Sequence, residues 1–222
     1  MHAPAKAQLW AANVIIPSDS RKLEGILTIP AGAQGVIVFA HGSGSGRLSP
    51  RNQFVARVLQ EGGLATLLLD LLEEGEEGDR RKVFDVRLLA DRLQSAADWL
   101  AEEPRTQHLR LGYFGASTGA AAALVAAARQ PVSVRAIVSR GGRPDLAGEW
   151  LPAVTAPTLL IVGGNDEIVL ELNKQALEQL RCQKQLVVIP GATHLFEEPG
   201  ALDEVARLAR EWFNRYLSDA GG

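Results

Sequence analysis

Continuous apolar runs recur along the chain and are typical of strands buried on both faces of a sheet. One such run leads into Gly115, and each is followed by a glycine, a polar residue or a turn. The other expected strands are Gly35 to Ala40, Leu64 to Leu69, Val134 to Ser139, Pro157 to Val162 and Gln185 to Ile189.

Between these runs, apolar residues three or four positions apart predict amphipathic helices. The expected helices are Asn52 to Glu61, Val83 to Leu100, an Ala-rich segment ending at Ala128, Leu172 to Leu180 and Leu202 to Leu217. Strands that alternate with helices predict an α/β fold in which a mostly parallel sheet carries helices on both faces.

The first segments follow a different pattern. Leu9 to Ile16 and Leu23 to Ile29 partly alternate between apolar and polar residues, and Pro17 to Ser20 reads as a turn between them. We therefore expect an antiparallel N-terminal hairpin at the edge of the sheet.

The length of 222 residues favours a single α/β domain, residues 1-222, with no room for a large cap domain. The net charge of −3 leaves no basic surface that would indicate nucleic acid or an anionic membrane as a partner. The composition thus favours chemistry on a small molecule. No oligomeric state follows from the sequence.

The lone Cys182 has neither a disulfide partner nor neighbours at metal-ligand spacing, so we interpret it as a small, partly buried apolar residue. The first 13 residues lack a long apolar segment, and no apolar run approaches the ~18 residues of a membrane span. We expect a reducing, cytoplasmic location.

The segment Gly115-Ala116-Ser117-Thr118-Gly119 links an apolar strand to the Ala-rich helix. This strand-turn-helix context is the one that a GxSxG nucleophile elbow requires, because the serine must project from a sharp turn and glycines must allow strand and helix to pass closely. Such a pentapeptide also arises by chance in a chain rich in small residues. Its setting favours Ser117 as a nucleophile.

A serine hydroxyl needs a neighbouring base, and the chain has four histidines. His2 lies at the terminus, and His108 precedes the strand that leads to Ser117, at the opposite end of the sheet. His194 follows the last strand and is expected at the same sheet edge as Ser117. We therefore predict His194 as the general base.

Asp166 directly follows the strand Pro157 to Val162 and its two glycines, so it emerges at that same edge. The chain order Ser117, Asp166, His194 is the order expected of α/β hydrolases. Two other acids stay open as alternatives: Asp70 as a turn or capping residue, and Asp145 as a helix cap or a displaced catalytic acid.

The transition state of acyl transfer carries negative charge on the former carbonyl oxygen, and backbone amides stabilise it. The amide of Thr118, at the start of a helix, is one predicted donor. The amide of Ser43, in the glycine-rich loop after Gly35 to Ala40, is the other. We interpret His41 as a residue that braces this loop rather than as a base.

Four motifs, HGSGS, GASTG, GGND and GATH, occur in this order and resemble the α/β hydrolase superfamily, in particular the dienelactone hydrolase-like proteins. The resemblance covers nearly the whole chain and implies an eight-stranded sheet, a catalytic triad of Ser117, Asp166 and His194, and no cofactor or metal. The namesake dienelactone hydrolases use a cysteine nucleophile, whereas this chain has Ser117. We therefore expect a serine esterase acting on carboxylic esters, with lactones and small acyl esters as candidate substrates.

Three other functions remain as alternatives. An acyltransferase would use the same acyl-enzyme, and a binding module would use the same fold without catalysis. Gly42, Gly44 and Gly46 after a buried strand resemble a dinucleotide fingerprint, but Arg47 stands where GxGxxG needs its last glycine.

Sequence patterns say little about the substrate pocket, which we expect from loops near residues 71–82, 140–150 and 195–198. Arg140 and Arg143 are candidates for attracting an anionic substrate, with surface solvation or structural pairing as the favoured alternative. The acidic stretch Glu73 to Asp79 is predicted to be a solvated loop.

Overall fold

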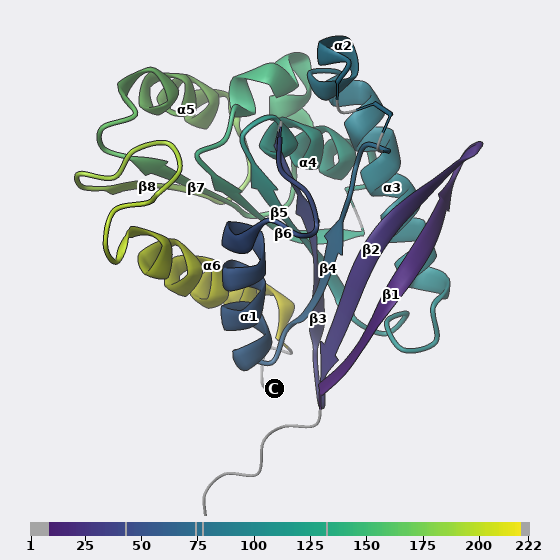
Figure 1. Cartoon of the computed structure of the whole chain (residues 1–222). Helices are drawn as coiled ribbons and strands as arrows, with labels where there is room; N and C mark the ends of the chain where they lie inside the picture. The colour runs from purple at the N-terminus through teal and green to yellow at the C-terminus, as the bar shows by residue number, and fades with distance from the viewer. Residues whose placement is uncertain (1–8, 43, 74, 77, 132, 219–222) are drawn as a thin grey trace, which may run out of the picture.

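Eight strands form one sheet in the order β1-β2-β4-β3-β5-β6-β7-β8 (Figure 1). The computed structural model describes residues 9–42, 44–73, 75–76, 78–131 and 133–218. The strands are β1 (Leu9–Ser18), β2 (Arg21–Pro30), β3 (Gly35–Ala40), β4 (Ala65–Leu69), β5 (Arg110–Ala116), β6 (Val134–Arg140), β7 (Thr158–Gly163) and β8 (Lys184–Ile189).

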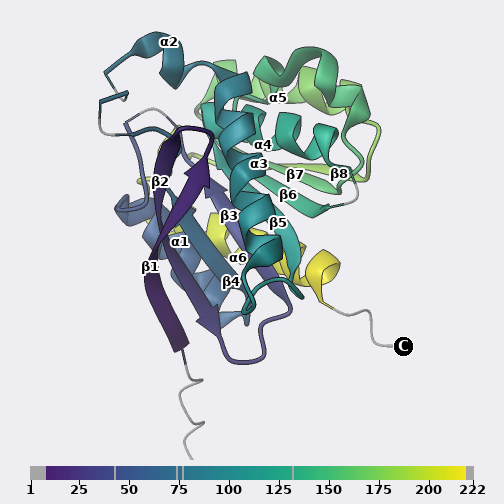
Figure 2. The same ribbon diagram turned by 90° about the vertical axis from the view of Figure 1, so that its right-hand side faces the viewer.

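The strand directions confirm the predicted sheet. β1 pairs antiparallel with β2, and β2 pairs antiparallel with β4, while every other neighbouring pair is parallel. The β1–β2 hairpin lies at the outer edge of the sheet, as its alternating pattern predicts (Figure 2). This is the α/β-hydrolase fold.

The helices between the strands differ from the predicted ones mainly near the carboxyl edge of the sheet. They are α1 (Pro50–Glu61), α2 (Arg80–Val83), α3 (Val86–Glu102), α4 (Thr118–Arg129), the 3₁₀ segment η1 (Pro144–Ala153), α5 (Glu167–Gln179) and α6 (Ala201–Leu217). α5 begins five residues before the predicted start at Leu172, because Asp166 takes the N-cap position and Glu167 suits the positive end of the helix dipole. Neither α2 nor η1 was predicted. α2 has only four residues, and η1 is interrupted at Gly148, so neither produces a regular helical pattern of apolar residues.

Helices cover both faces of the sheet (Figures 1 and 2). α1 and α6 lie on one face, and α3, α4 and α5 lie on the other, where η1 also packs. β3 shows how the sequence produces these layers, because all six of its residues are buried. Ile37 and Phe39 join the apolar cluster under α1 and α6, whereas Val36 and Val38 join the one under α3 and α4.

The parallel strands end together at one edge of the sheet. The last residues of β3 and β5 are close in register, with Ala40 opposite Gly115, and Ala116 at the end of β5 lies opposite Arg140. The loops that follow these strands therefore meet at this carboxyl edge, which is where open α/β sheets bind ligands. No helix in the described ranges has both the length and the apolar composition needed to cross a membrane.

The prediction of a solvated acidic loop at Glu73 to Asp79 is wrong for Glu76. Its carboxylate is only 5% exposed and accepts hydrogen bonds from Arg92 of α3 at 2.6 and 3.0 Å and from Lys82 at 2.9 Å. Arg92 also donates to the Leu71 carbonyl oxygen at 2.6 Å. This ion pair fixes the segment after β4 against α3, close to the carboxyl edge of the sheet.

Hydrogen bonds from Arg92 lower the pKa of Glu76 from 4.5 to about 2, against the opposing effect of burial, and Lys82 adds to the lowering. The charged form therefore stabilises the fold fully above pH 4.5, and this contribution is lost as the pH falls toward 2.

We expect Glu76→Gln to lower the free energy of unfolding by about 3 kcal/mol near pH 7, because Arg92 is left buried without its charged partner. Denaturant unfolding between pH 7 and 3 checks this. The difference between variant and wild type should shrink by about 1–3 kcal/mol at the acidic end. Glu102→Gln, at the exposed end of α3, is the control, and a Glu76→Gln effect no larger than that of the control contradicts the assignment.

Candidate active site

Ser117 occupies a strained turn between β5 and α4. Its backbone φ of 51° and ψ of −125° are unusual for a residue other than glycine and cost about 1–3 kcal/mol. The flanking glycines make this turn sterically possible. A Cβ atom at Gly115 would lie 2.4 Å from Ala120 Cα, and one at Gly119 would lie 2.0 Å from the Ala40 carbonyl oxygen. The elbow predicted from GxSxG is therefore present.

The loop after β3 lies directly over Ser117. A Cβ atom at Gly42 would come within 2.7 Å of Ser117 Cβ, so only glycine fits at this approach. His41 holds the loop in place, because its Nε2 accepts a hydrogen bond from the Leu71 amide at 2.8 Å and its Nδ1 lies 3.0 Å from the Gly42 carbonyl oxygen. The Nε2 acceptor requires Nδ1 to carry the proton, so His41 ties the end of β3 to the end of β4. This matches the bracing role predicted for it.

Asp166 and His194 are in direct contact. The carboxylate Oδ2 of Asp166 lies 2.6 Å from His194 Nδ1. Asp166 makes no side-chain capping bond to α5, although it occupies the N-cap position. A carboxylate accepts rather than donates, so Nδ1 carries the proton of this hydrogen bond, and in that tautomer of the ring Nε2 is the acceptor nitrogen.

A backbone clamp between the loops after β7 and β8 produces this contact. A Cβ atom at Gly163 would lie 2.3 Å from the Ala192 carbonyl oxygen, and the Asn165 amide donates to that same oxygen at 2.9 Å. The Asn165 side chain also donates to the Gly191 carbonyl oxygen at 2.9 Å. Asp166 and His194 each follow this clamp by one or two residues.

The segment Gly141 to Arg143 contacts both halves of the site. Gly141 has a φ of +50°, and a Cβ there would lie 3.5 Å from His194 Nδ1. At the other end, the Arg143 amide donates to the Ser117 carbonyl oxygen at 3.0 Å. The loop after β6 therefore contacts both Ser117 and His194 at the carboxyl edge, although no hydrogen bond joins the side chains of these two residues in the described part of the chain.

The alternative acids are engaged elsewhere. Asp145 forms a two-point ion pair with Arg143 at 2.9 and 2.8 Å, so the structural pairing expected for Arg143 is present. Asp70 accepts from the Arg47 amide at 2.5 Å and from the Arg47 guanidinium. Neither carboxylate has a recorded contact with His194. Its partner is Asp166.

Thr118 begins α4, and the helix offers no acceptor for its amide. Its buried side-chain oxygen also has no partner in the described part of the chain. Thr118 lines a small cavity with Gly42 and Leu72. Ser43, the other predicted donor, lies outside the described residues.

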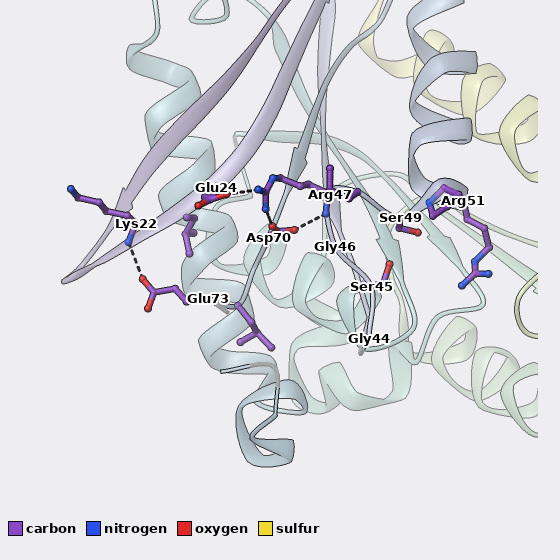
Figure 3. A pocket seen from close by; sticks show the side chains of 14 residues that line it. Lys22, Glu24, Gly44, Ser45, Gly46, Arg47, Ser49, Arg51, Asp70 and Glu73 are labelled. Atoms are coloured by element: carbon purple, nitrogen blue, oxygen red, sulfur yellow. Dashed lines mark hydrogen bonds and ion pairs between the residues drawn. The ribbon is translucent and has the colours of Figure 1, made fainter. Parts of the chain in front are cut away.

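A groove of about 740 Å³ runs beside this cavity and shares Gly44, Ser45 and Leu72 with it (Figure 3). Its walls carry both signs of charge, including the Arg47–Asp70 pair and Arg51 at the start of α1. The groove therefore offers space for a part of a ligand that extends away from Ser117.

Sequence analysis named some of the loops at this edge but not their exposed apolar side chains. Five large apolar side chains are more than a third exposed in the segments that follow the carboxyl ends of the strands. They are Leu48, Phe84, Leu146, Ile168 and Leu195. The signal available in the sequence was a single apolar residue within an otherwise polar loop, which also occurs without function. Among the described residues, no group of three or more His, Cys, Asp or Glu side chains could hold a metal ion.

Comparison with known proteins identifies the family. The model of the dienelactone hydrolase family matches residues 23–218. The chain belongs to the dienelactone hydrolase family. A dienelactone hydrolase from Anabaena variabilis is 60% identical, with a TM-score of 0.93 over 95% of this chain and 100% of that one.

Other relatives agree on the fold. A Pyrococcus furiosus esterase shares only 18% identity but has a TM-score of 0.78 over 95% of this chain and 94% of its own. A Mycobacterium tuberculosis protein provisionally named a phosphoribosyl transferase is 60% identical over 219 residues. This match covers 99% of the chain but 49% of the relative, so the chain spans about half the length of that protein. Family and neighbours support a hydrolase of this fold.

We expect Gly119→Ala to lower the free energy of unfolding by about 3 kcal/mol or more, because the new methyl group would overlap backbone atoms of β3 that cannot move independently. Chemical denaturation measures the change. Gly78→Ala is the matched control, since nothing lies within 4 Å of a Cβ at that position. A Gly119→Ala protein as stable as the Gly78→Ala protein would contradict the close approach of α4 to β3.

Proposed function

We propose that this member of the dienelactone hydrolase family is a serine esterase that hydrolyses carboxylic esters through an acyl-enzyme on Ser117. One observation carries the proposal: the Asp166–His194 contact of 2.6 Å stands at the same sheet edge as a serine in a strained, positive-φ turn. Strain of this kind persists where the surrounding structure enforces it, and it is concentrated at functional sites.

In the first half of the reaction, His194 Nε2 takes the proton from Ser117 Oγ as the oxygen attacks the ester carbonyl carbon. The tetrahedral intermediate then collapses, and the imidazolium gives its proton to the departing alcohol. Asp166 holds the Nδ1 proton and stabilises the imidazolium while it exists.

In the second half, water attacks the acyl carbon and His194 removes its proton. The second tetrahedral intermediate then breaks its bond to Ser117 Oγ and releases the carboxylic acid, while the imidazolium returns its proton to Oγ. The amide of Thr118, at the positive end of α4, donates to the oxyanion in both halves. We assign the second donor to the amide of Ser43 on the basis of the sequence alone.

Two exposed apolar side chains favour an ester with an apolar portion, because Leu195 directly follows His194 and Ile168 follows Asp166 after Glu167.

We expect Ser117→Ala to abolish ester turnover without lowering the midpoint of thermal unfolding, because the hydroxyl is the nucleophile and contributes no recorded side-chain hydrogen bond. Turnover of p-nitrophenyl esters of increasing acyl length, with lactones included, measures activity and substrate range. A fluorophosphonate probe, followed by peptide mass mapping, should modify Ser117 in the folded wild type. Substantial turnover in the Ser117→Ala protein, or no adduct on Ser117, would refute the esterase proposal and favour a non-catalytic module.

We expect Asp166→Asn to lower kcat on the order of 10⁴-fold, because the amide no longer fixes the His194 tautomer or stabilises its cation. Asp145→Asn is the matched control, since it removes a carboxylate from the same region that is bound to Arg143. Steady-state kinetics of both variants decide between the two acids. A larger loss for Asp145→Asn would transfer the role to Asp145.

A further inference from the structure

Arg140 is a buried cation without a counter-charge. It is the last residue of β6 and is only 8% exposed. Among the residues that the structure describes, it has no hydrogen bond and no ion pair, and its Nη1 is fully buried without an acceptor. Burial of a guanidinium is unfavourable unless acceptors replace the water that it loses. Such a group is suited to binding an anion.

The position of Arg140 places this charge beside the catalytic residues. It lies opposite Ala116, the residue before Ser117, and opposite Ile161 of β7. Side chains alternate along a strand, so Arg140 lies on the same face as Val138, which packs under α1 and α6. The next residue, Gly141, contacts His194.

Arg51 adds a second cation from the start of α1. Its only recorded ion pair joins Nη1 to Glu197 at 3.3 Å on the exposed side, and its Nε is buried without an acceptor. A cation in the first turn opposes the helix dipole, and α1 has no acidic residue there to compensate. The amides of Arg51 and Asn52 also lack an acceptor among the described residues. The start of α1 therefore carries uncompensated positive charge and hydrogen-bond donors without acceptors in the described part of the chain.

The two arginines border the same short loop. Glu197 pairs with Arg51, and the ring of the preceding residue, Phe196, lies 3.3 Å from a Cβ position on Gly141, next to Arg140. Burial, together with the positive charge of Arg51, lowers the pKa of Arg140 to about 10, so Arg140 is still charged at neutral pH. Arg51 also lines the large groove (Figure 3), and that groove shares Gly44, Ser45 and Leu72 with the small cavity at Thr118.

We propose that Arg140 and Arg51 bind a phosphoryl group carried by the ester substrate. Two guanidinium groups and the free amides at the start of α1 supply more donors than the two oxygens of a carboxylate use, whereas a tetrahedral dianion can bridge both cations. This inference rests on the proposed esterase function for the rest of the substrate. The binding of the anion itself does not depend on catalysis.

Inorganic phosphate is the probe, and isothermal titration calorimetry at pH 7.5 measures its binding. We expect Arg140→Gln and Arg51→Gln each to weaken binding roughly ten- to a hundredfold, which is the effect of losing a charge-assisted hydrogen bond. Arg207→Gln, which makes the same change of charge on the exposed face of α6, should bind like the wild type. Ser117→Ala should also retain phosphate binding.

Two further measurements separate binding from folding and from catalysis. In phosphate-free buffer, Arg140→Gln should unfold at the same or a higher temperature than the wild type, because it removes an unpaired buried charge. Phosphate should inhibit hydrolysis of a neutral ester competitively, and the inhibition constant should rise by a similar factor in Arg140→Gln. If Arg140→Gln does not fold, the phosphate affinity and the inhibition constant are measured on Arg51→Gln instead.

The proposal is overturned if the wild type does not bind phosphate, if Arg140→Gln or Arg51→Gln binds it like the wild type, or if acetate binds as tightly as phosphate. Phosphate binding without ester turnover would refute the esterase function and leave this site standing. Ester turnover without phosphate binding would refute the phosphate site and leave the esterase function standing.

Discussion

The site depends on the tight turn at Ser117, where β5 passes into α4 within one residue. The turn demands a positive φ from a residue with a side chain and brings the first turn of α4 against β3. Only glycine at positions 115 and 119 makes that approach possible, and Gly42 closes over the serine from the other side. The sheet thus supplies a rigid frame, and the strain is concentrated at the residue that we assign as the nucleophile.

The other half of the site has its own rigid support. The clamp between the loops after β7 and β8 uses backbone contacts at Gly163 and Asn165, so the Asp166–His194 pair does not rely on flexible side chains for its position. A catalytic base that is held in this way needs little reorganisation as charge develops on it.

Much of this arrangement could be predicted from the sequence because it is encoded locally. A buried strand that ends in GASTG specifies an elbow, and polar residues after parallel strands must meet at one edge. The contacts of Glu76 and Arg92 were missed because they join residues that are 16 positions apart, and a charge within an acidic loop resembles a solvated one. The isolation of Arg140 was equally hidden, since only the packed structure shows that no carboxylate of the described residues reaches it.

The buried Glu76–Arg92 ion pair and the buried Arg140 have opposite consequences. Glu76 and Arg92 satisfy each other and fasten the segment after β4. Arg140 is unsatisfied among the described residues and lies one strand position from the elbow. An ion pair whose two charges bind each other stabilises the fold. A buried cation without such a partner, close to the proposed nucleophile, is better suited to recognising a ligand.

The acyl-enzyme itself tests the central claim most directly. The wild-type protein is mixed with a p-nitrophenyl ester, quenched in acid within the first turnovers and digested for peptide mass spectrometry. The account predicts a burst of p-nitrophenol and the mass of the acyl group on the peptide that contains Ser117, at the serine itself. Turnover with the acyl group on a different residue, or with no acylated peptide at any quench time, would contradict it.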